Sequence, residues 1–376
     1  MSRDKLKIAF LQRGNDPYTD ERIKYFRSNG HSVYSISFFQ VKDNKRIDEV
    51  RYLTFRRLIT DKIPLVKRFS HYFELKKILI SVKPDIFHVV SALNLLYLNY
   101  DLPFKKIIEN QGSDLILTPR KNKFLIPLYK KYFKQADGVI QDSQLLYEKS
   151  LEYGAGDKNG FNQVIEIGID FSIFNPETEK NIIRSRYNLH DRPILLHTRG
   201  NDRIYNLDII LLALIRVIKK IPDITLILTT SFEKLSLRNK RIIKKHNIFS
   251  NIVFAGFQDR INDLKYFYAD ADIVISVPSS DSSPFSVYES IACKTPVIIS
   301  DLPWLYSKFT PGKHLLTVPV RDSEKLACRI IDYFNGDLKN IDIDAAYEIV
   351  FEKINLQTEN NKLERLYYNI LNANSN

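Results

Sequence analysis

Short apolar runs alternate along the chain with longer stretches in which apolar residues recur every three or four positions. The runs favour strands buried on both faces, and the amphipathic stretches favour helices. Strands that alternate with helices predict parallel sheets covered by helices, which is an α/β architecture. The strands expected in the first part of the chain are Lys7–Gln12, Ser32–Phe38, Ile86–Val90, Ile107–Glu109, Gly138–Gln141 and Val164–Ile167.

The same alternation restarts after a polar stretch at residues 175–188. We therefore predict two doubly wound, Rossmann-like domains, residues 1–175 and 176–350, with a last helix at about 350–376 packing back on the first. The strands expected in the second domain are Ile194–His197, Thr225–Leu228, Ile252–Ala255, Ile273–Val277 and Val297–Ile299. The helices expected include Asp20–Ser28, Leu207–Lys220 and Asn262–Tyr268, and the final stretch, about Ala345–Leu371, is expected to be helical.

The composition agrees with a folded protein of two domains. The chain has 376 residues, of which 44% are hydrophobic and 27% charged, which is ordinary for globular proteins. No apolar run reaches the roughly 18 residues that a membrane-spanning helix needs. The two cysteines, Cys293 and Cys328, exclude a disulfide framework and an all-cysteine zinc site, so we expect a cytoplasmic location.

The positive charge is unevenly distributed. Residues 1–176 hold 29 basic and 20 acidic side chains and so account for +9 of the net charge of +12. Lysine, arginine and aromatic residues interleave at 51–83 and 120–134. Such a surface suits an anionic membrane, a nucleic acid or an acidic substrate. The alternative is a solvated basic face on helices whose aromatic side chains point into the core, and the sequence leaves both open.

The segment from Ala271 to Trp304 is the most informative one. The strand Ile273–Val277 leads through a small polar loop, Pro284 and Phe285 into a helix that Ser286 could cap. The N-terminus of a helix offers unpaired N–H groups and a positive dipole end, which suit phosphate oxygens. Glu289 follows Ser286 by three residues, which is also the spacing of a capping box, in which Glu289 would bond the Ser286 N–H.

This segment resembles the donor-site motif of retaining glycosyltransferases of family 4. That family has the GT-B fold, two Rossmann-like domains facing each other across a cleft. Asp281 and Glu289 stand at the two acidic positions of the motif, and Ala292, Thr295, Pro296, Val297, Ser300 and Asp301 fit the remainder. The resemblance implies that Glu289 bonds the nucleotide ribose and Asp281 the donor sugar, while the backbone of Phe285–Val287 holds the diphosphate.

Two further segments resemble this family. Ile165–Pro176 is similar to its link between domains, and Leu195–Leu212 to the first strand and helix of its donor domain. Arg199 matches an arginine that neutralises the diphosphate, and Arg203 is our candidate to replace a lysine that is missing here. The implied catalytic residues are Arg199, Asp281 and Glu289. The implied donor-binding residues are Gly200, Arg203, Ser283, Pro284, Phe285, Ser286 and Val287.

This chain also departs from the family pattern. Asp281 is one methylene shorter than the usual glutamate, and Ser282-Ser283-Pro284 replaces the common Gly-Phe-Gly. On the acceptor side, Pro84–His88 and Gln111–Asp114 resemble two family segments. The acceptor-side candidates are Gly14, Asp16, His88, Gly112 and Asp114. An ordinary turn at Gly14 and Asp16, a core histidine at His88 and a helix cap at Asp114 are the competing interpretations.

The resemblance implies an enzyme that moves a sugar, with retention of configuration, from a UDP- or GDP-sugar to a glycan or glycolipid. No cofactor or metal is implied, although Asp270-Ala271-Asp272 and Asp342-Ile343-Asp344 match the metal-binding Asp-x-Asp by letters alone. We expect a peripheral position on the inner face of the cytoplasmic membrane through 51–83 and 120–134. One alternative is a nucleotide-sugar epimerase or hydrolase of the same fold. The other is a basic nucleic-acid-binding protein, against which the Asp281–Asp301 segment argues.

Overall fold

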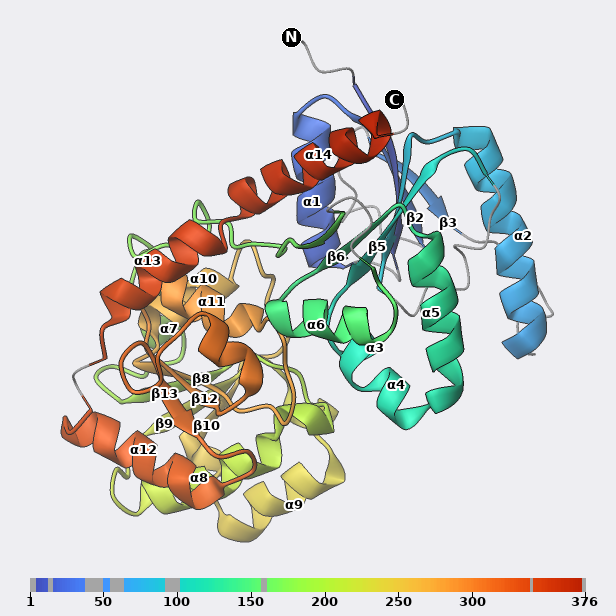
Figure 1. Cartoon of the computed structure of the whole chain (residues 1–376). Coiled ribbons are helices and arrows are strands. Elements are labelled where there is room, and N and C mark those ends of the chain that lie inside the picture. The colour runs from blue at the N-terminus through green and yellow to red at the C-terminus, as the bar shows by residue number, and fades with distance from the viewer. Residues whose placement is uncertain are drawn as a thin grey trace. The chain divides into compact units, whose positions relative to one another are not determined.

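The computed structural model describes residues 5–12, 16–37, 50–54, 64–91, 102–156, 161–338 and 341–373, with the backbone alone described at 17, 54, 64–70 and 113. The chain forms two compact units (Figure 1). The first contains residues 1–168 and 357–376, and the second contains residues 169–356. The sequence analysis had placed the boundary after residue 175, whereas the chain divides after Gly168.

The first unit is built on a parallel seven-stranded sheet in the order β3-β2-β1-β4-β5-β6-β7. The strand order reverses direction between β1 and β4, as in Rossmann-type sheets. The strands are β1 Lys7–Gln12, β2 Ser32–Ser37, β3 Arg51–Thr54, β4 Ile86–Val90, β5 Lys105–Asn110, β6 Gly138–Gln141 and β7 Asn162–Val164. The helices are α1 Pro17–Ser28, α2 Pro64–Val82, α3 Ser113–Ile116, α4 Thr118–Lys121, α5 Ile126–Gln135, α6 Gln144–Glu152 and α14 Leu356–Asn372, with a 3₁₀ turn, η4, at Lys123–Leu125.

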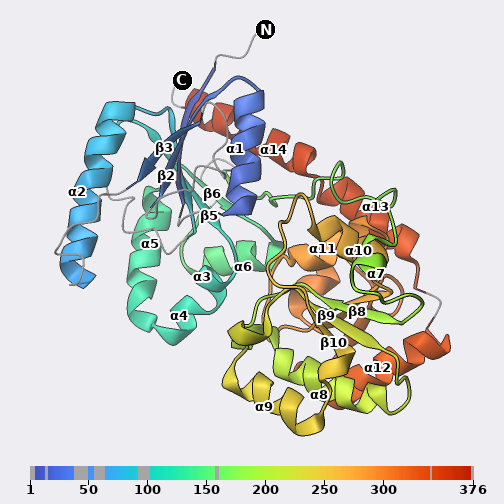
Figure 2. The same ribbon diagram turned by 180° about the vertical axis from the view of Figure 1, so that it is seen from behind.

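Both faces of this sheet are buried, which explains the uninterrupted apolar runs of its strands. Alternate side chains of a strand point to opposite faces. In β1, Ile8 and Phe10 pack with α1 and α14, whereas Ala9 and Leu11 pack with the layer that contains α2 and α5. The two helical layers can be followed in Figures 1 and 2.

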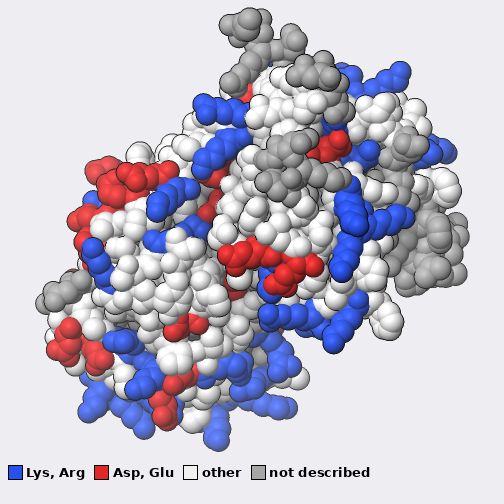
Figure 3. Space-filling view, viewed as in Figure 1, with Lys and Arg blue, Asp and Glu red and all other residues white. Residues whose placement is uncertain are grey.

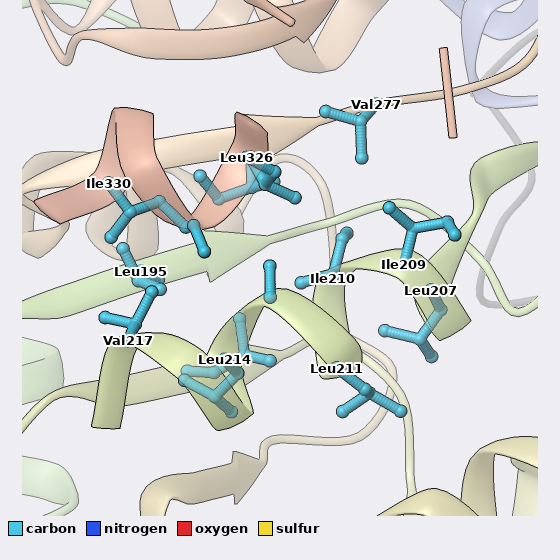
Figure 4. Close-up of a cluster of buried hydrophobic side chains, with 14 of the residues drawn as sticks. Leu195, Leu207, Ile209, Ile210, Leu211, Leu214, Val217, Val277, Leu326 and Ile330 are labelled. Atoms are coloured by element: carbon cyan, nitrogen blue, oxygen red, sulfur yellow. The ribbon is translucent and has the colours of Figure 1, made fainter. Parts of the chain in front are cut away.

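The second unit repeats this plan with a parallel six-stranded sheet in the order β10-β9-β8-β11-β12-β13. Helices α8, α9 and α12 cover one face, where Leu214 and Ile330 pack in one cluster with Leu195 of the sheet (Figure 4). Helix α11 packs against β11 and β12, and α10 against β8. The strands are β8 Ile194–His197, β9 Thr225–Leu228, β10 Ile252–Phe254, β11 Ile273–Ser276, β12 Val297–Ser300 and β13 Leu316–Val318. The helices are α7 Ile182–Arg186, α8 Leu207–Ile218, α9 Leu237–His246, α10 Leu264–Asp270, α11 Phe285–Ala292, α12 Ser323–Asn335 and α13 Ile343–Lys353; 3₁₀ turns are η5 Arg203–Tyr205, η6 Phe232–Lys234, η7 Phe249–Asn251 and η8 Pro303–Ser307.

These sheets confirm the predicted α/β architecture, and the differences lie at the sheet edges and in the last helix. The edge strands β3 and β13 were not predicted, and the last strand of the first unit ends at Val164 where we expected it to begin. The predicted final helix is two helices, because the Ile354 carbonyl and the Leu356 N–H bond to Ile169 instead of continuing one helix. Within the described residues, no helix is both long and apolar enough to cross a membrane.

A buried polar network joins α1, β4, β5 and α14 inside the first unit. Arg22 lies 3.5 Å from Glu109 and donates to the carbonyls of Ile165 and Glu166. His88 Nε2 lies 2.9 Å from Glu109, and its Nδ1 bonds to the Tyr367 hydroxyl. Burial alone would raise the pKa of Glu109, but the charge of Arg22 and the hydrogen bond to His88 hold it at about 2. The network is therefore a buried, internally compensated charge cluster.

We predict that Arg22→Met lowers the unfolding free energy by about 3–5 kcal/mol, because it leaves the buried Glu109 without its cation. Urea unfolding at pH 7 measures this loss. Lys24→Met, at an exposed position of the same helix, is the control and should change the stability by less than about 0.5 kcal/mol. Equal effects of the two substitutions would contradict this account of the network.

A second buried histidine ends β8, two residues before Arg199. His197 is 1% exposed, and its Nδ1 lies 2.9 Å from the Ile275 carbonyl of the neighbouring strand. A carbonyl only accepts, so Nδ1 carries the proton of the neutral ring. Burial lowers the pKa of His197 to about 4. Between pH 6.5 and 4 the unfolded chain therefore binds a proton at this residue that the folded chain does not, and stability falls as the pH falls.

We predict that His197→Asn, which keeps a donor for the Ile275 carbonyl, removes this part of the acid sensitivity. The loss of unfolding free energy between pH 7 and pH 4.5 should be about 2 kcal/mol smaller in the variant than in the natural protein. Urea titrations at both pH values measure the difference, with His246→Asn at an exposed position of α9 as the control. Parallel pH profiles for His197→Asn and the natural protein would exclude His197 as the cause.

Candidate functional site

The carboxyl ends of β8 and β11 bring together three of the residues that the sequence analysis selected. Arg199, in the loop after β8, forms an ion pair with Asp281, with 3.0 Å between Nη2 and Oδ2. Its Nη1 lies 3.5 Å from Ser286 Oγ, at the start of α11. The guanidinium also lies over the Tyr205 ring, 4.4 Å from its centre. Arg199 is therefore held by the two loops and the helix at once.

Asn206 connects the loop after β8 with the loop after β11 through side-chain hydrogen bonds. Its side-chain amide donates to the Val277 carbonyl at 2.9 Å, and its oxygen accepts from Arg321 at 2.8 Å. Asn206 has a φ of +52°, a left-handed conformation that asparagine tolerates better than most residues. The Ser279 N–H also bonds to the Ile204 carbonyl. This fastening fixes the loop that carries Arg199 against the loop that carries Asp281.

Helix α11 begins at Phe285, with Pro284 as the residue before its first turn. Ser286 is inside the helix, where its hydroxyl lies 3.3 Å from that of Ser276. The capping box that we considered for Ser286 and Glu289 is therefore not formed. Proline lacks an N–H, so the first backbone donors of the helix come after it.

Glu289 is buried one turn into α11 and has two firm partners. Arg260 Nε lies 2.5 Å from Oε1, and the Tyr268 hydroxyl donates to Oε2 at 2.8 Å. The carboxylate side chain is only 3% exposed. A carboxylate in this position is costly unless it is paired, and these two donors pair it.

The other predicted donor-side residues differ in exposure. Arg203 and Gly200 are exposed, and Phe285 is half-buried. Ser283, Pro284, Ser286 and Val287 are buried. A narrow gap beside Asp281 is lined by Ser276, Ser300 and Trp304 among others. The gap has no room for a water molecule, so it is not a small-molecule pocket.

The acceptor-side candidates lie in the first unit and have local structural partners. His88 is fully buried and contacted at both ring nitrogens, which is the core-histidine interpretation rather than an exposed acceptor contact. Asp16 caps α1 by accepting from the N–H groups of Tyr18 and Thr19. Burial raises the pKa of Asp16 despite these bonds. Gly14 lies outside the described residues.

Gly112 and Asp114 form the turn that leads into α3. Gly112 has a φ of +110°, which favours glycine. Asp114 is 3% exposed and accepts from the Ser91 hydroxyl at 3.2 Å and the Gln111 N–H at 3.5 Å. Its side chain thus connects the turn after β5 to Ser91, which follows the end of β4.

The aspartates of the two Asp-x-Asp triplets contact backbone N–H groups or basic side chains of the fold. Asp270 accepts from the N–H groups of Asn181 and Ile183, and Asp272 pairs with Arg184 at 3.0 Å. Asp342 caps α13 through the Ala345 N–H. In the described part of the chain, no group of three histidine, cysteine or acidic side chains is arranged to hold a metal ion.

Three residues of the site were missed in the sequence. Arg260 and Asn206 stand in or next to loops without a periodic pattern, and Tyr268 lies in α10, where the helical pattern marks it only as a buried position. Arg260 reaches Glu289 across 29 residues, and Tyr268 across 21. The sequence offered a local indication for Asn206 alone, because an asparagine just before a helix often adopts the left-handed backbone conformation.

Two family models match the chain. Residues 192–335 match the model described as "Glycosyl transferases group 1". Residues 7–143 match the model described as "Glycosyl transferase 4-like". No curated protein matches the sequence significantly.

Solved structures share the fold along nearly the whole chain. A glycosyltransferase from Rickettsia africae is 20% identical with a TM-score of 0.78, and the match covers 98% of this chain and 99% of that one. Sucrose-phosphate synthase from Thermosynechococcus elongatus is 18% identical with a TM-score of 0.81, over 98% and 100%. HepE from Anabaena, in complex with UDP and glucose, is 16% identical with a TM-score of 0.75, over 96% and 98%.

The fold and the family models agree. The two matched ranges take up most of both units and include the loops around Arg199 and Asp281. The chain belongs to the group 1 glycosyltransferases, enzymes that transfer sugars.

Proposed function

We propose that this enzyme transfers a sugar, with retention of configuration, from a UDP- or GDP-sugar to a glycan or glycolipid. The observation that carries the proposal is the meeting of Arg199, Asp281 and the start of α11 at one sheet edge. In parallel sheets this edge is the usual ligand-binding edge. The UDP and glucose held by the similar HepE support a nucleotide-sugar donor.

The charges at this edge suit a departing nucleoside diphosphate. Negative charge builds on the phosphate oxygens as the bond from sugar to phosphate breaks. Arg199 and the N-terminus of α11 supply a fixed positive charge and oriented N–H groups for it. Asp281, 3.0 Å from Arg199, holds the guanidinium in place and offers a carboxylate to the sugar hydroxyls. Metal ions have no step in this proposal.

Glu289 takes the ribose hydroxyls in this proposal. Its carboxylate lies on the same short helix as Ser286, one turn further from the diphosphate end. Arg203, exposed and close to Arg199 in sequence, is the second cation for the diphosphate. Asp281 and Glu289 thus have binding roles and do not form an acid–base pair.

The nucleotide and its metal dependence are tested together. Thermal unfolding is followed with UDP, GDP, ADP and CMP and their sugar conjugates, with and without EDTA. We predict that one nucleoside diphosphate at 100 times its Kd stabilises the protein by about 2.7 kcal/mol, and that EDTA does not reduce this. No stabilisation by any of them would overturn the proposed donor, and a loss with EDTA would overturn the metal-free mechanism.

Steady-state transfer kinetics with the identified sugar conjugate should then be measured on a variant of the proposed charge-stabilising arginine. Arg199→Ala should lower kcat on the order of 10²–10³-fold, because it removes a preorganised positive charge from the leaving group. Arg192→Ala, at an exposed position just before β8 and so at the other end of the same strand, is the matched control. A product analysis by NMR shows whether the anomeric configuration is retained.

We also propose that the first unit rests on an anionic membrane surface. Phe124 of η4 is 95% exposed, and exposed Arg120, Lys121 and Lys123 surround it in sequence. Figure 3 shows basic side chains gathered over α4 and α5. On α2, Phe73 and Ile80 are 59% and 48% exposed. Other aromatic residues of the basic stretches, including Tyr129 and Phe133, point into the core, so only part of the predicted surface is outward-facing.

We predict that Phe124→Ser combined with Lys121→Gln and Lys123→Gln weakens binding to phosphatidylglycerol vesicles by at least tenfold. Each basic residue near such a surface contributes roughly 1 kcal/mol, and the buried ring adds to this. Flotation with vesicles of phosphatidylglycerol and phosphatidylcholine measures binding. The double variant Lys219→Gln and Lys220→Gln, exposed at the end of α8, is the control for lost charge. Absence of binding by the natural protein would refute the membrane contact.

A further inference from the structure

Arg260 connects three parts of the second unit, although it lies outside the motifs that the sequence analysis selected. It lies in the loop between β10 and α10. Its Nε contacts Glu289 at 2.5 Å. Its guanidinium lies over the ring of Phe174 at 5.1 Å and over the ring of Phe285 at 5.7 Å. Phe285 is the first residue of α11, and Phe174 comes from the start of this unit.

This packing restricts Arg260 to a single orientation. The guanidinium is planar, and its contacts with the rings of Phe174 and Phe285 limit its rotation. The Arg260 side chain is 10% exposed and the Glu289 side chain 3%. An ion pair shielded from water to this extent is screened little by salt. The position of the Glu289 carboxylate therefore depends on Arg260 more than a surface pair would.

The remaining bonding capacity of Glu289 suits a diol. Each carboxylate oxygen has two lone-pair directions, and an ionised carboxylate only accepts. Arg260 uses one direction at Oε1, and Tyr268 uses one at Oε2. Each oxygen keeps one direction, so the carboxylate can accept one hydroxyl at each oxygen. Two neighbouring ribose hydroxyls present this pair of donors.

We infer that Arg260 is a positioning residue for donor recognition, which orients Glu289 toward the ribose hydroxyls, with Tyr268 as its second support. The inference rests on the proposed role of Glu289. The ribose does not change its charge while the sugar is transferred. Its contact with Glu289 is therefore made equally in the ground state and the transition state, and losing it raises KM while leaving kcat nearly unchanged.

The experiment compares Arg260→Met and Arg260→Lys with the natural protein, using calorimetric titration with UDP and GDP and steady-state kinetics with the matching sugar conjugate. Arg260→Met should raise the nucleotide Kd and the donor KM about tenfold or more, with kcat changed by less than about threefold. Arg260→Lys should recover part of the affinity, because it restores the charge without the planar fork. Arg216→Met is the control. Arg216 pairs with Glu324 at 2.8 Å in the same unit, but both are exposed.

The outcomes separate this inference from the proposed function. If the natural protein binds neither UDP nor GDP, the proposed donor fails and the role of Arg260 fails with it. If the natural protein binds and Arg260→Met binds equally well, only the role of Arg260 is overturned. A fall in kcat at unchanged KM would overturn it too, since that pattern assigns Arg260 to the chemical step.

If Arg260→Met does not fold, a milder substitution at the second partner of Glu289 still tests the inference. Tyr268→Phe removes one hydroxyl from Oε2 of Glu289 and keeps the ring in place. It should raise the nucleotide Kd about threefold to tenfold with kcat unchanged, since it removes one hydrogen bond to a charged group. Circular dichroism and urea unfolding establish that the variants are folded. Natural affinity in folded Tyr268→Phe and Arg260→Lys would overturn the inference.

Discussion

A carboxylate that leaves water during folding has to be paired, and the second unit is arranged around one such group. Glu289 is carried by α11, its cation comes from the loop after β10, and its hydroxyl donor comes from α10. Three separate elements must therefore reach their final places before this charge is compensated. The cost of leaving it unpaired is several kcal/mol, which makes the arrangement of these elements cooperative.

The first unit also contains a buried carboxylate that has to be paired, Glu109, and its surroundings differ from those of the second unit. Glu109 is also buried and paired with an arginine, but its second partner is His88, and all three side chains are buried. At the edge of the second sheet, Arg199 and Asp281 keep 18% and 12% of their side-chain surface exposed. Solvent therefore reaches Arg199 and Asp281 in part, whereas it does not reach the charges around Glu109.

The sequence predicted the central strands and part of the site, for reasons that can be named. Strands such as β1, β8 and β11 are continuous apolar runs, because helices cover both of their faces. Parallel strands end at the same sheet edge, and the resemblance to family 4 glycosyltransferases selected Arg199 and Asp281 in the loops that follow two of these strands. Strand β3 was missed because its four residues, which include Arg51 and Thr54, lie at an edge and show no apolar run. Arg260 was missed because its partner is 29 residues away and no local pattern encodes such a contact.

The order of the two units along the chain has a consequence for synthesis on the ribosome. Helix α14 supplies Leu363, Leu366, Tyr367 and Ile370 to the core of the first unit. These residues leave the ribosome only after the whole second unit, residues 169–356, has been made. The second unit can fold as soon as it emerges, whereas the first waits with one sheet face covered only in part, by α1. The half of the protein that is made first is thus completed last, and its exposed apolar face is the part that needs protection from aggregation during translation.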